Sequence, residues 1–290
     1  MLKKGDTAGI VCCSDGIDER RRGSIARTKE QLEQLGLHTV ESPFLYRRES
    51  LASGSPAERA EVLDQMYRDP GIRAIFDVSG GNLANQVLEY LDYELLRREG
   101  KEIWGYSDLT VLLNAVYAKT GCSSWLYQVR NLSGKEGEIQ KKRMKRMMEE
   151  QDETALMPDD WEFLQGNRME GVVLGGNIRC FLKLAGTEYF PDMENKILFL
   201  ESYGGGIGVI TSLLTQLRQM GVFRKIGGLL LGTFTELDEA EGKETIEKLV
   251  IEIIGTEKMA VARSMSVGHG EGSCGMHIGK KIRIGYCSHA

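Results

Sequence analysis

The sequence predicts a two-domain α/β protein, and three observations lead to this fold class. The chain has 290 residues, which corresponds to about two domains at ~150 residues each. Over residues 8–119, short apolar runs alternate with segments of helical period, a pattern typical of parallel strands joined by crossover helices. A charged segment at 134–165 then separates this half from a second half with a similar alternation.

The N-terminal half contains four apolar runs that predict strands, at residues 8–13, 38–40, 74–78 and 102–104. The spacing of apolar residues predicts helices over 25–35, 59–67, 83–98 and 109–119. We therefore expect residues 1–133 to form one domain with a parallel sheet.

The middle of the chain reads differently from both halves. Residues 134–160 mix acidic and basic side chains without a sustained strand pattern, which predicts a solvated helix and then a linker up to residue 165. Beyond it, apolar runs predict strands at 172–174, 197–200, 228–231, 259–261 and 281–284. Helices are expected near 178–185, 209–220 and 244–254. Residues 166–290 are therefore the expected C-terminal α/β domain, and no internal repeat is evident.

Composition and charge exclude several classes of protein. Hydrophobic residues make up 41% and charged residues 27% of the chain, which is ordinary for a globular protein. Lys and Arg number 37 against 42 Asp and Glu, so the net charge of -5 argues against a nucleic-acid partner. The longest uncharged stretch, 202–217, is too polar and too short to span a bilayer. The N-terminus has no signal-peptide pattern, so we expect a cytoplasmic protein without a membrane segment.

Cysteines and a glycine motif raise two further possibilities. The six cysteines are irregularly spaced and include no CxxC pair, which argues against a disulfide framework. Gly270–Gly275 fits GxGxxG, but a turn and a strand follow instead of a helix, so we reject a dinucleotide site there. His269, Cys274 and His277 lie within nine residues, yet their spacing matches no strong zinc signature. A metal-dependent hydrolase built on these three side chains stays a rival hypothesis.

The first candidate for chemistry is Ser107, in the segment Gly105-Tyr106-Ser107-Asp108 between a predicted strand and a predicted helix. A serine at such a turn is exposed, and the amide of Asp108 at the helix N-terminus is placed to stabilise an oxyanion. The nucleophile-elbow pattern GxSxG is only half met, because Leu109 replaces the second glycine. The alternative is an ordinary helix-capping serine.

The second candidate is the turn Ser79-Gly80-Gly81-Asn82, which follows an apolar strand. Its backbone N–H groups can bind an anion or a developing oxyanion, so Gly80 and Asn82 are candidate substrate-binding residues. The turn lacks the Lys-Ser/Thr ending of a phosphate-binding P-loop. Taken alone, such a segment is more often a simple tight turn.

Glu201 and His269 are the remaining candidates. Glu201 closes an apolar strand just before Gly204, where a carboxylate can hold an imidazole, or simply meet solvent at a strand end. His269 is bracketed by glycines on a loop that can approach another residue closely, and histidine is the usual general base at neutral pH. The alternative is an exposed loop histidine.

Together these segments resemble the serine LD-carboxypeptidase family, which includes murein tetrapeptide carboxypeptidases and microcin C self-immunity peptidases. The resemblance extends over almost the whole chain and rests on the segments Gly5-Asp6, Ser79-Gly80-Gly81, Asn85-Gln86, Leu91-Asp92-Tyr93, Gly105–Thr110, Gly175-Gly176-Asn177, Leu184–Thr187, Lys196–Glu201, Leu214–Arg218 and Val267–Gly270.

The resemblance implies a role for each candidate. Ser107 is then the nucleophile, His269 the general base and Glu201 the residue that orients it. Asp108 and Gly81 supply oxyanion amides, with the choice between Gly80 and Gly81 open. The family architecture implies a flavodoxin-like N-terminal domain that carries the serine, a C-terminal domain that carries the other two residues, and an active site at their interface. It also implies a homodimer and no metal or organic cofactor.

Departures from the family pattern leave the substrate open. Many tetrapeptide carboxypeptidases have Arg-Gly-Gly-Tyr-Gly where this chain has Ser79–Leu83, and the Gly-Pro usually found near 125–129 is missing. The leading hypothesis is hydrolysis of an amide next to a terminal amino acid, most simply the L,D bond of a muropeptide tetrapeptide. The alternatives are cleavage of an aminoacyl-nucleotide amide, as in microcin immunity, and a catalytically silent binding protein.

Overall fold

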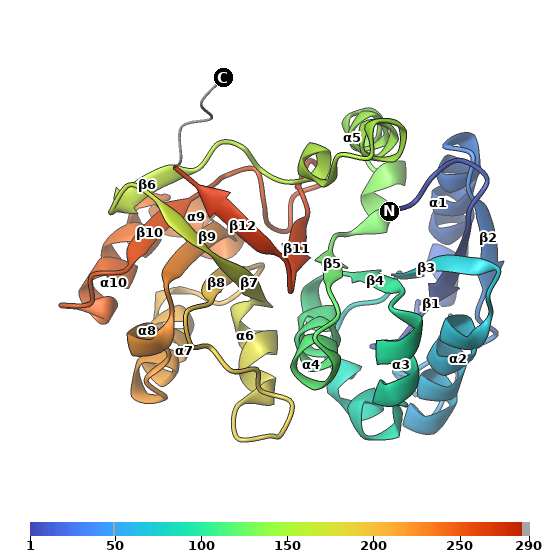
Figure 1. The fold of residues 1–290 in the computed structure, drawn as a ribbon, viewed down its shortest axis with the longest axis horizontal. Helices are drawn as coiled ribbons and strands as arrows, with labels where there is room; N and C mark the ends of the chain where they lie inside the picture. Colours follow the sequence, from blue (N-terminus) through green and yellow to red (C-terminus); the bar gives the residue numbers. More distant parts are fainter. Residues whose placement is uncertain (49, 286–290) are drawn as a thin grey trace.

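The computed structural model describes residues 1–48 and 50–285, which form two six-stranded sheets lying side by side (Figure 1). Cys287, one of the cysteines considered above, lies outside the described residues, as does His289. Within the described part of the chain, no helix is long and apolar enough to cross a membrane.

The N-terminal sheet has the strand order β11-β5-β4-β3-β1-β2, in which β1 to β5 are parallel and β11 is antiparallel to β5. The order 2-1-3-4-5 is the flavodoxin-like arrangement, so this part of the predicted fold is confirmed. The strands are β1 (Thr7–Val11), β2 (His38–Glu41), β3 (Ile72–Asp77), β4 (Glu102–Gly105), β5 (Ser124–Leu126) and β11 (Met276–Ile278).

Helices cover both faces of the N-terminal sheet. One face packs against α1 (Arg22–Gln34) and α5 (Gly137–Glu150) around the ring stack of Trp104 and Trp125. The other face packs against α2 (Pro56–Arg68), α3 (Tyr93–Glu99) and α4 (Thr110–Thr120). Short 3₁₀ helices complete this half: η1 (Glu19–Arg21), η2 (Ala84–Tyr90), η3 (Ser107–Leu109), η4 (Val129–Ser133) and η5 (Glu153–Leu156).

The C-terminal sheet has the order β12-β7-β8-β9-β10-β6, with β7 to β10 parallel and an antiparallel strand at each edge. Its strands are β6 (Glu162–Gln165), β7 (Met169–Asn177), β8 (Ile197–Ser202), β9 (Gly228–Phe234), β10 (Ala260–Arg263) and β12 (Lys281–Ile284). The helices of this half are α6 (Ile178–Phe181), η6 (Leu182–Leu184), α7 (Ile207–Gln219), α8 (Val222–Lys225), α9 (Thr235–Glu241) and α10 (Glu244–Ile254).

Two predicted helices differ from those in the structure. The single helix expected over 83–98 is broken into η2 and α3, because the Asp92 side chain accepts a hydrogen bond from the amide of Leu95 and begins a new helix. The helix expected to be solvated, α5, buries Met144, Met147 and Met148 against the sheet. Its apolar residues recur at helical spacing among the charges.

The two sheets are joined through α4. Asn114 of α4 exchanges two hydrogen bonds of 2.8 Å with the backbone of Gly175 in β7. Thr110 Oγ1 accepts a hydrogen bond of 3.0 Å from the amide of Asn177. The strand β11, far along the chain, pairs with β5 of the first sheet. These contacts bring the ends of β4 and β7 together, so residues that follow them meet between the halves.

Candidate active site

Ser107 lies directly after β4 and has a backbone φ of +58°. This left-handed conformation is uncommon for a residue with a side chain, and such strain gathers at functional sites. Glycine is required at position 105, the last residue of β4, because a Cβ atom there would lie 2.7 Å from the Cβ of Leu109. The strand therefore turns sharply into η3 with the Ser107 hydroxyl at its apex, as in a nucleophile elbow.

His269 contacts Ser107 from the other half of the molecule. Its Nε2 lies 3.1 Å from Ser107 Oγ, and its Nδ1 lies 2.6 Å from Glu201 Oε2. The imidazole is 15% exposed, so it is enclosed but reachable. Gly268 is needed before it, because a Cβ atom at that φ of +158° would lie 1.7 Å from Thr233 Oγ1. The arrangement of nucleophile, base and orienting carboxylate matches a serine-hydrolase triad.

Glu201 lies near the carboxyl end of β8 and is fully buried. Within residues 1–48 and 50–285, neither its second oxygen, Oε1, nor the buried hydroxyl of Tyr106 has a hydrogen-bond partner of standard geometry. Burial raises the pKa of Tyr106 well above its usual value, and the nearby Glu201 carboxylate raises that pKa further. The Tyr106 ring also packs edge-on against His269 at 5.0 Å. Tyr106 thus encloses the carboxylate and the imidazole from the side of β4.

The turn at residues 79–82 borders Ser107. A Cβ atom at Gly80 would lie 3.9 Å from the Cβ of Ser107, so Gly80 is the glycine that faces the serine. Gly81 has a φ of +123°, and a Cβ atom there would overlap the carboxylate of Asp15 at 2.2 Å. That carboxylate accepts a hydrogen bond of 2.8 Å from the amide of Asn82. The Asp15 carboxylate therefore holds the backbone of the turn in place, and only glycine fits at position 81.

The side chain of Asp108 connects the segments around the site. It is fully buried and accepts hydrogen bonds from Ser14 Oγ at 2.6 Å and from the amide of Ala84 at 2.9 Å. Its other oxygen pairs with Lys183 Nζ at 2.5 Å. The amide of Asp108 belongs to the first turn of η3, where N–H groups have no acceptor within the helix. The side chain is thus structural, and the amide remains available for an oxyanion.

Several residues around the site had no signal in the sequence. Asp15 follows the first strand, and Lys183 lies in a stretch that reads as an ordinary helix. Both act over long separations in sequence, through Asn82 and Asp108. For Asp15, the position after β1, at the edge where parallel sheets usually bind ligands, is the one feature that indicates a role.

The rival zinc set is not assembled. His277 lies in β11, fully buried, with Nε2 2.8 Å from Glu102 and Nδ1 3.2 Å from Glu153. In residues 1–48 and 50–285, Glu102, Glu153 and His277 are the one group of three potential metal ligands, and the group includes neither Cys274 nor His269. Its two carboxylates contact different ring nitrogens, which is the geometry of an ion-pair network rather than a chelate. Gly270–Gly275 is followed by β11 rather than by a helix.

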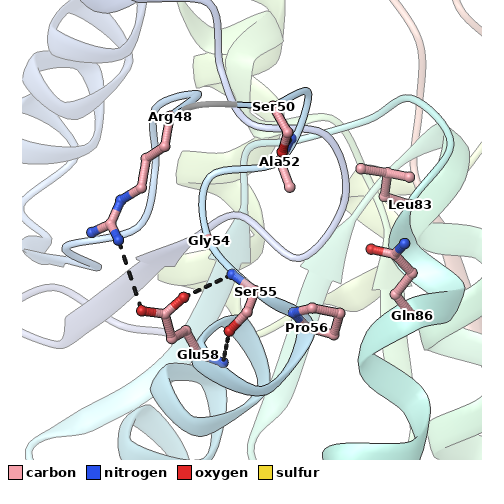
Figure 2. A pocket seen from close by; sticks show the side chains of 9 residues that line it. All are labelled: Arg48, Ser50, Ala52, Gly54, Ser55, Pro56, Glu58, Leu83 and Gln86. Carbon is pink, nitrogen blue, oxygen red and sulfur yellow. Dashed lines mark hydrogen bonds and ion pairs between the residues drawn. The ribbon is translucent and has the colours of Figure 1, made fainter.

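A pocket of about 590 Å³ lies beside the loop that carries Arg48 (Figure 2). It lies between the loop that carries Arg48 and the start of η2, where Leu83 and Gln86 form one wall. Ser55 and Glu58 bond to each other's backbone in a capping box at its base. None of Ser107, Glu201 and His269 lines this pocket. It is therefore separate from the group formed by Ser107, His269 and Glu201.

Comparisons with known proteins point in the same direction. Residues 8–127 match the model of the LD-carboxypeptidase N-terminal domain, and residues 170–284 match that of the LD-carboxypeptidase C-terminal domain. The chain is 29% identical to the putative carboxypeptidase YocD of Bacillus subtilis, over 98% of this chain and 94% of that protein. It is 27% identical to a probable murein peptide carboxypeptidase of the same organism, over 98% and 90%.

A solved structure shares the whole fold. MccF in complex with glutamyl sulfamoyl guanosine superimposes with a TM-score of 0.86 over 97% of this chain and 93% of that chain, at 23% sequence identity. This likeness confirms the predicted arrangement of two α/β domains with parallel sheets.

Proposed function

The chain belongs to the LD-carboxypeptidase family of serine carboxypeptidases, and from this premise we propose that Ser107, His269 and Glu201 are its catalytic triad. One observation carries the proposal: the hydrogen bonds from Ser107 to His269 and from His269 to Glu201 join side chains from both halves of the molecule. The proposed domains, 1–133 and 166–290 with the segment 134–165 between them, each contribute part of this group.

In the proposed reaction, His269 Nε2 takes the proton of Ser107 as the hydroxyl oxygen attacks the carbonyl carbon of the scissile amide. The carbon–nitrogen bond then breaks, and the amine leaves with the proton that His269 holds. Water attacks the resulting ester, again with His269 as the base, and releases the acid and the free serine. Glu201 accepts a hydrogen bond from Nδ1–H and stabilises the imidazolium.

The amides of Asp108 and Gly81 are the proposed oxyanion donors. The first directly follows the nucleophile, and the second lies in the turn that packs against it. Preorganised amides of this kind contribute about 10²- to 10³-fold to turnover. Gly80 and Asn82 lie on either side of Gly81 in this turn and are the proposed contacts to the substrate backbone.

The proposed substrate is a muropeptide tetrapeptide, whose L,D amide next to the terminal residue would be cut. The relative named a probable murein peptide carboxypeptidase supports this choice. An aminoacyl-nucleotide amide is the second candidate, because the fold is shared with MccF in complex with glutamyl sulfamoyl guanosine. We further propose a homodimer in the cytoplasm, to be tested by light scattering and by fractionation of cells.

The test is to incubate the purified chain separately with a murein tetrapeptide and with an aminoacyl sulfamoyl nucleotide and to identify the products by mass. We expect release of the terminal amino acid from the tetrapeptide. The Ser107→Ala variant should be slower by about 10⁴- to 10⁶-fold. If Ser107→Ala cleaves as fast as the wild type, the triad is refuted, and if neither compound is cleaved, a silent binding protein is favoured.

A further inference from the structure

Arg179 connects the C-terminal half to the glycine turn beside Ser107. It lies in the first turn of α6, and its Nη1 donates to Asn82 Oδ1 at 2.8 Å. Its Nη2 donates to the carbonyl oxygen of Gly81 at 3.3 Å. The side chain is exposed to solvent. A cationic group is thus held on the glycine turn that borders Ser107, bonded to the residue after Gly80, the glycine that faces the serine.

The charge of Arg179 is not neutralised. Among the described residues, no carboxylate forms an ion pair with it, and both of its hydrogen-bond acceptors are uncharged. Lys183, one helical turn further on, behaves differently, because its ammonium pairs with Asp108 at 2.5 Å. Arg179 is therefore the cation of this pair that is free to attract an anion.

The geometry of the guanidinium suits a carboxylate. Arginine has more N–H donors than the two bonds to Asn82 and Gly81 use, and they lie in a plane that matches both oxygens of a carboxylate. The two neutral acceptors fix the direction of the group while leaving its charge intact. Such charge-assisted, bidentate pairs are the stronger and more specific hydrogen bonds of proteins.

A carboxypeptidase has to recognise a terminal amino acid, and the free carboxylate distinguishes that residue from an internal one. Building on the proposed function, we propose that Arg179 binds the terminal carboxylate of the substrate and restricts cleavage to the last amide. The buried Ser79 carries no charge, and its hydroxyl is used by Asp77 at 2.5 Å, so the turn itself supplies no cation. Arg179 supplies one from across the interface.

The experiment compares a murein tetrapeptide that ends in a free carboxylate with the same peptide ending in an amide. The wild type should prefer the acid by at least about tenfold in kcat/KM, the usual value of one charged hydrogen bond. Arg179→Gln should lose about 10- to 100-fold on the acid, so that the acid-to-amide ratio falls towards one. Arg179→Lys should keep part of the preference, because it retains the charge but not the planar fork.

Arg27→Gln, an equal charge change on the exposed face of α1, is the matched control and should keep the wild-type ratio. If Arg179→Gln slows the acid and the amide by the same factor, Arg179 only positions the turn and the proposal is overturned.

Calorimetric binding of both peptides to Ser107→Ala separates this proposal from the proposed function, since it needs no turnover. We expect the acid to bind more tightly than the amide in Ser107→Ala, and this difference to vanish when Arg179→Gln is added. If the Ser107→Ala single variant binds the acid and the amide with equal affinity, the proposed role of Arg179 is overturned, even if Ser107 proves to be the nucleophile.

Discussion

Two histidines near the end of the chain have similar partners and different surroundings. His269 lies on a glycine-flanked loop between Ser107 and Glu201, and it is 15% exposed. His277 lies in β11 between Glu102 and Glu153, fully buried and stacked on Trp125 at 4.2 Å. Each uses both ring nitrogens. Of the two, His269 is the one that has a hydroxyl as a partner and a partly exposed ring.

The difference shows which features suit a histidine to the proposed role of general base. A neutral imidazole offers one donor and one acceptor, which suits a hydroxyl on one side and a carboxylate on the other. His277 instead lies between two carboxylates, which act only as acceptors when ionised. Burial alone would raise the pKa of Glu102, but the hydrogen bond and charge of His277 lower it overall. His277 therefore links β11 to Glu102 of β4 and to Glu153 of η5.

The largest effect is expected from His269→Gln. Glutamine keeps an N–H donor for Glu201 but cannot take the proton of Ser107. Turnover should fall by about 10⁴-fold or more, while the free energy of unfolding changes by about 1 kcal/mol or less. Steady-state kinetics and urea unfolding of the same preparation measure both quantities. Turnover within about tenfold of the wild type would remove His269 from the mechanism.

His277→Phe should give the opposite result. The ring stack on Trp125 is kept, but Glu102 and Glu153 lose their partner, so the free energy of unfolding should fall by about 2 to 4 kcal/mol. Because the folded-state pKa of Glu102 is lowered, this stabilisation is present above its unfolded pKa and is lost as the pH falls through the folded value. Urea unfolding at neutral and acidic pH should therefore show a loss that shrinks in acid.

His38→Phe, at an exposed site in β2, is the control for that series and should change stability by less than about 0.5 kcal/mol. If His277→Phe abolishes turnover while the protein stays fully folded, the contrast between the two histidines fails.

Asp64 extends the comparison to a buried carboxyl whose ion-pair partner, among the described residues, is Arg68 rather than a histidine. Burial raises the pKa of Asp64 to about 6, above its ordinary value of 3.8. The native state then binds more protons than the unfolded state between these values, so stability falls as the pH rises from about 4 to 6. Asp64→Asn should remove this penalty and stabilise the protein by about 1 to 2 kcal/mol at pH 7. Thermal unfolding at pH 4 and pH 7 checks it.

Glu30→Gln, on the exposed face of α1, is the matched control for Asp64→Asn and should leave the pH dependence unchanged. A loss of stability in Asp64→Asn at pH 7 would show that the ionised carboxylate contributes through the amide of Asp92, its hydrogen-bond partner.

Much of the fold could be predicted locally, because strand and helix alternate with clear breaks at glycines. Ser107 follows an apolar strand, Glu201 ends one and His269 is bracketed by glycines, so short local patterns indicate all three residues. That these three side chains contact one another could not be predicted from periodicity, because the contact depends on the order of strands in two sheets. The break before Tyr93 and the pairing of β11 with β5 were missed for related reasons: one depends on a side-chain cap and the other on a contact across about half the chain.

Residues that act through long-range contacts left no local trace. Arg179 and Lys183 occur in an ordinary amphipathic stretch, and Asp15 in a loop, yet all three hold the turn beside Ser107. The buried methionines of α5 were masked by the surrounding charges, which dominate the average over that segment.

The central claim is that Ser107 is activated by His269 from the opposite half. It is tested most directly by treating the protein with a serine-directed acylating probe at neutral pH and mapping the modified peptide by mass. We expect modification of Ser107 in the wild type and in folded His277→Phe, and a rate lower by several orders of magnitude in His269→Gln. Modification of another residue, or equal rates in the wild type and His269→Gln, would contradict the account.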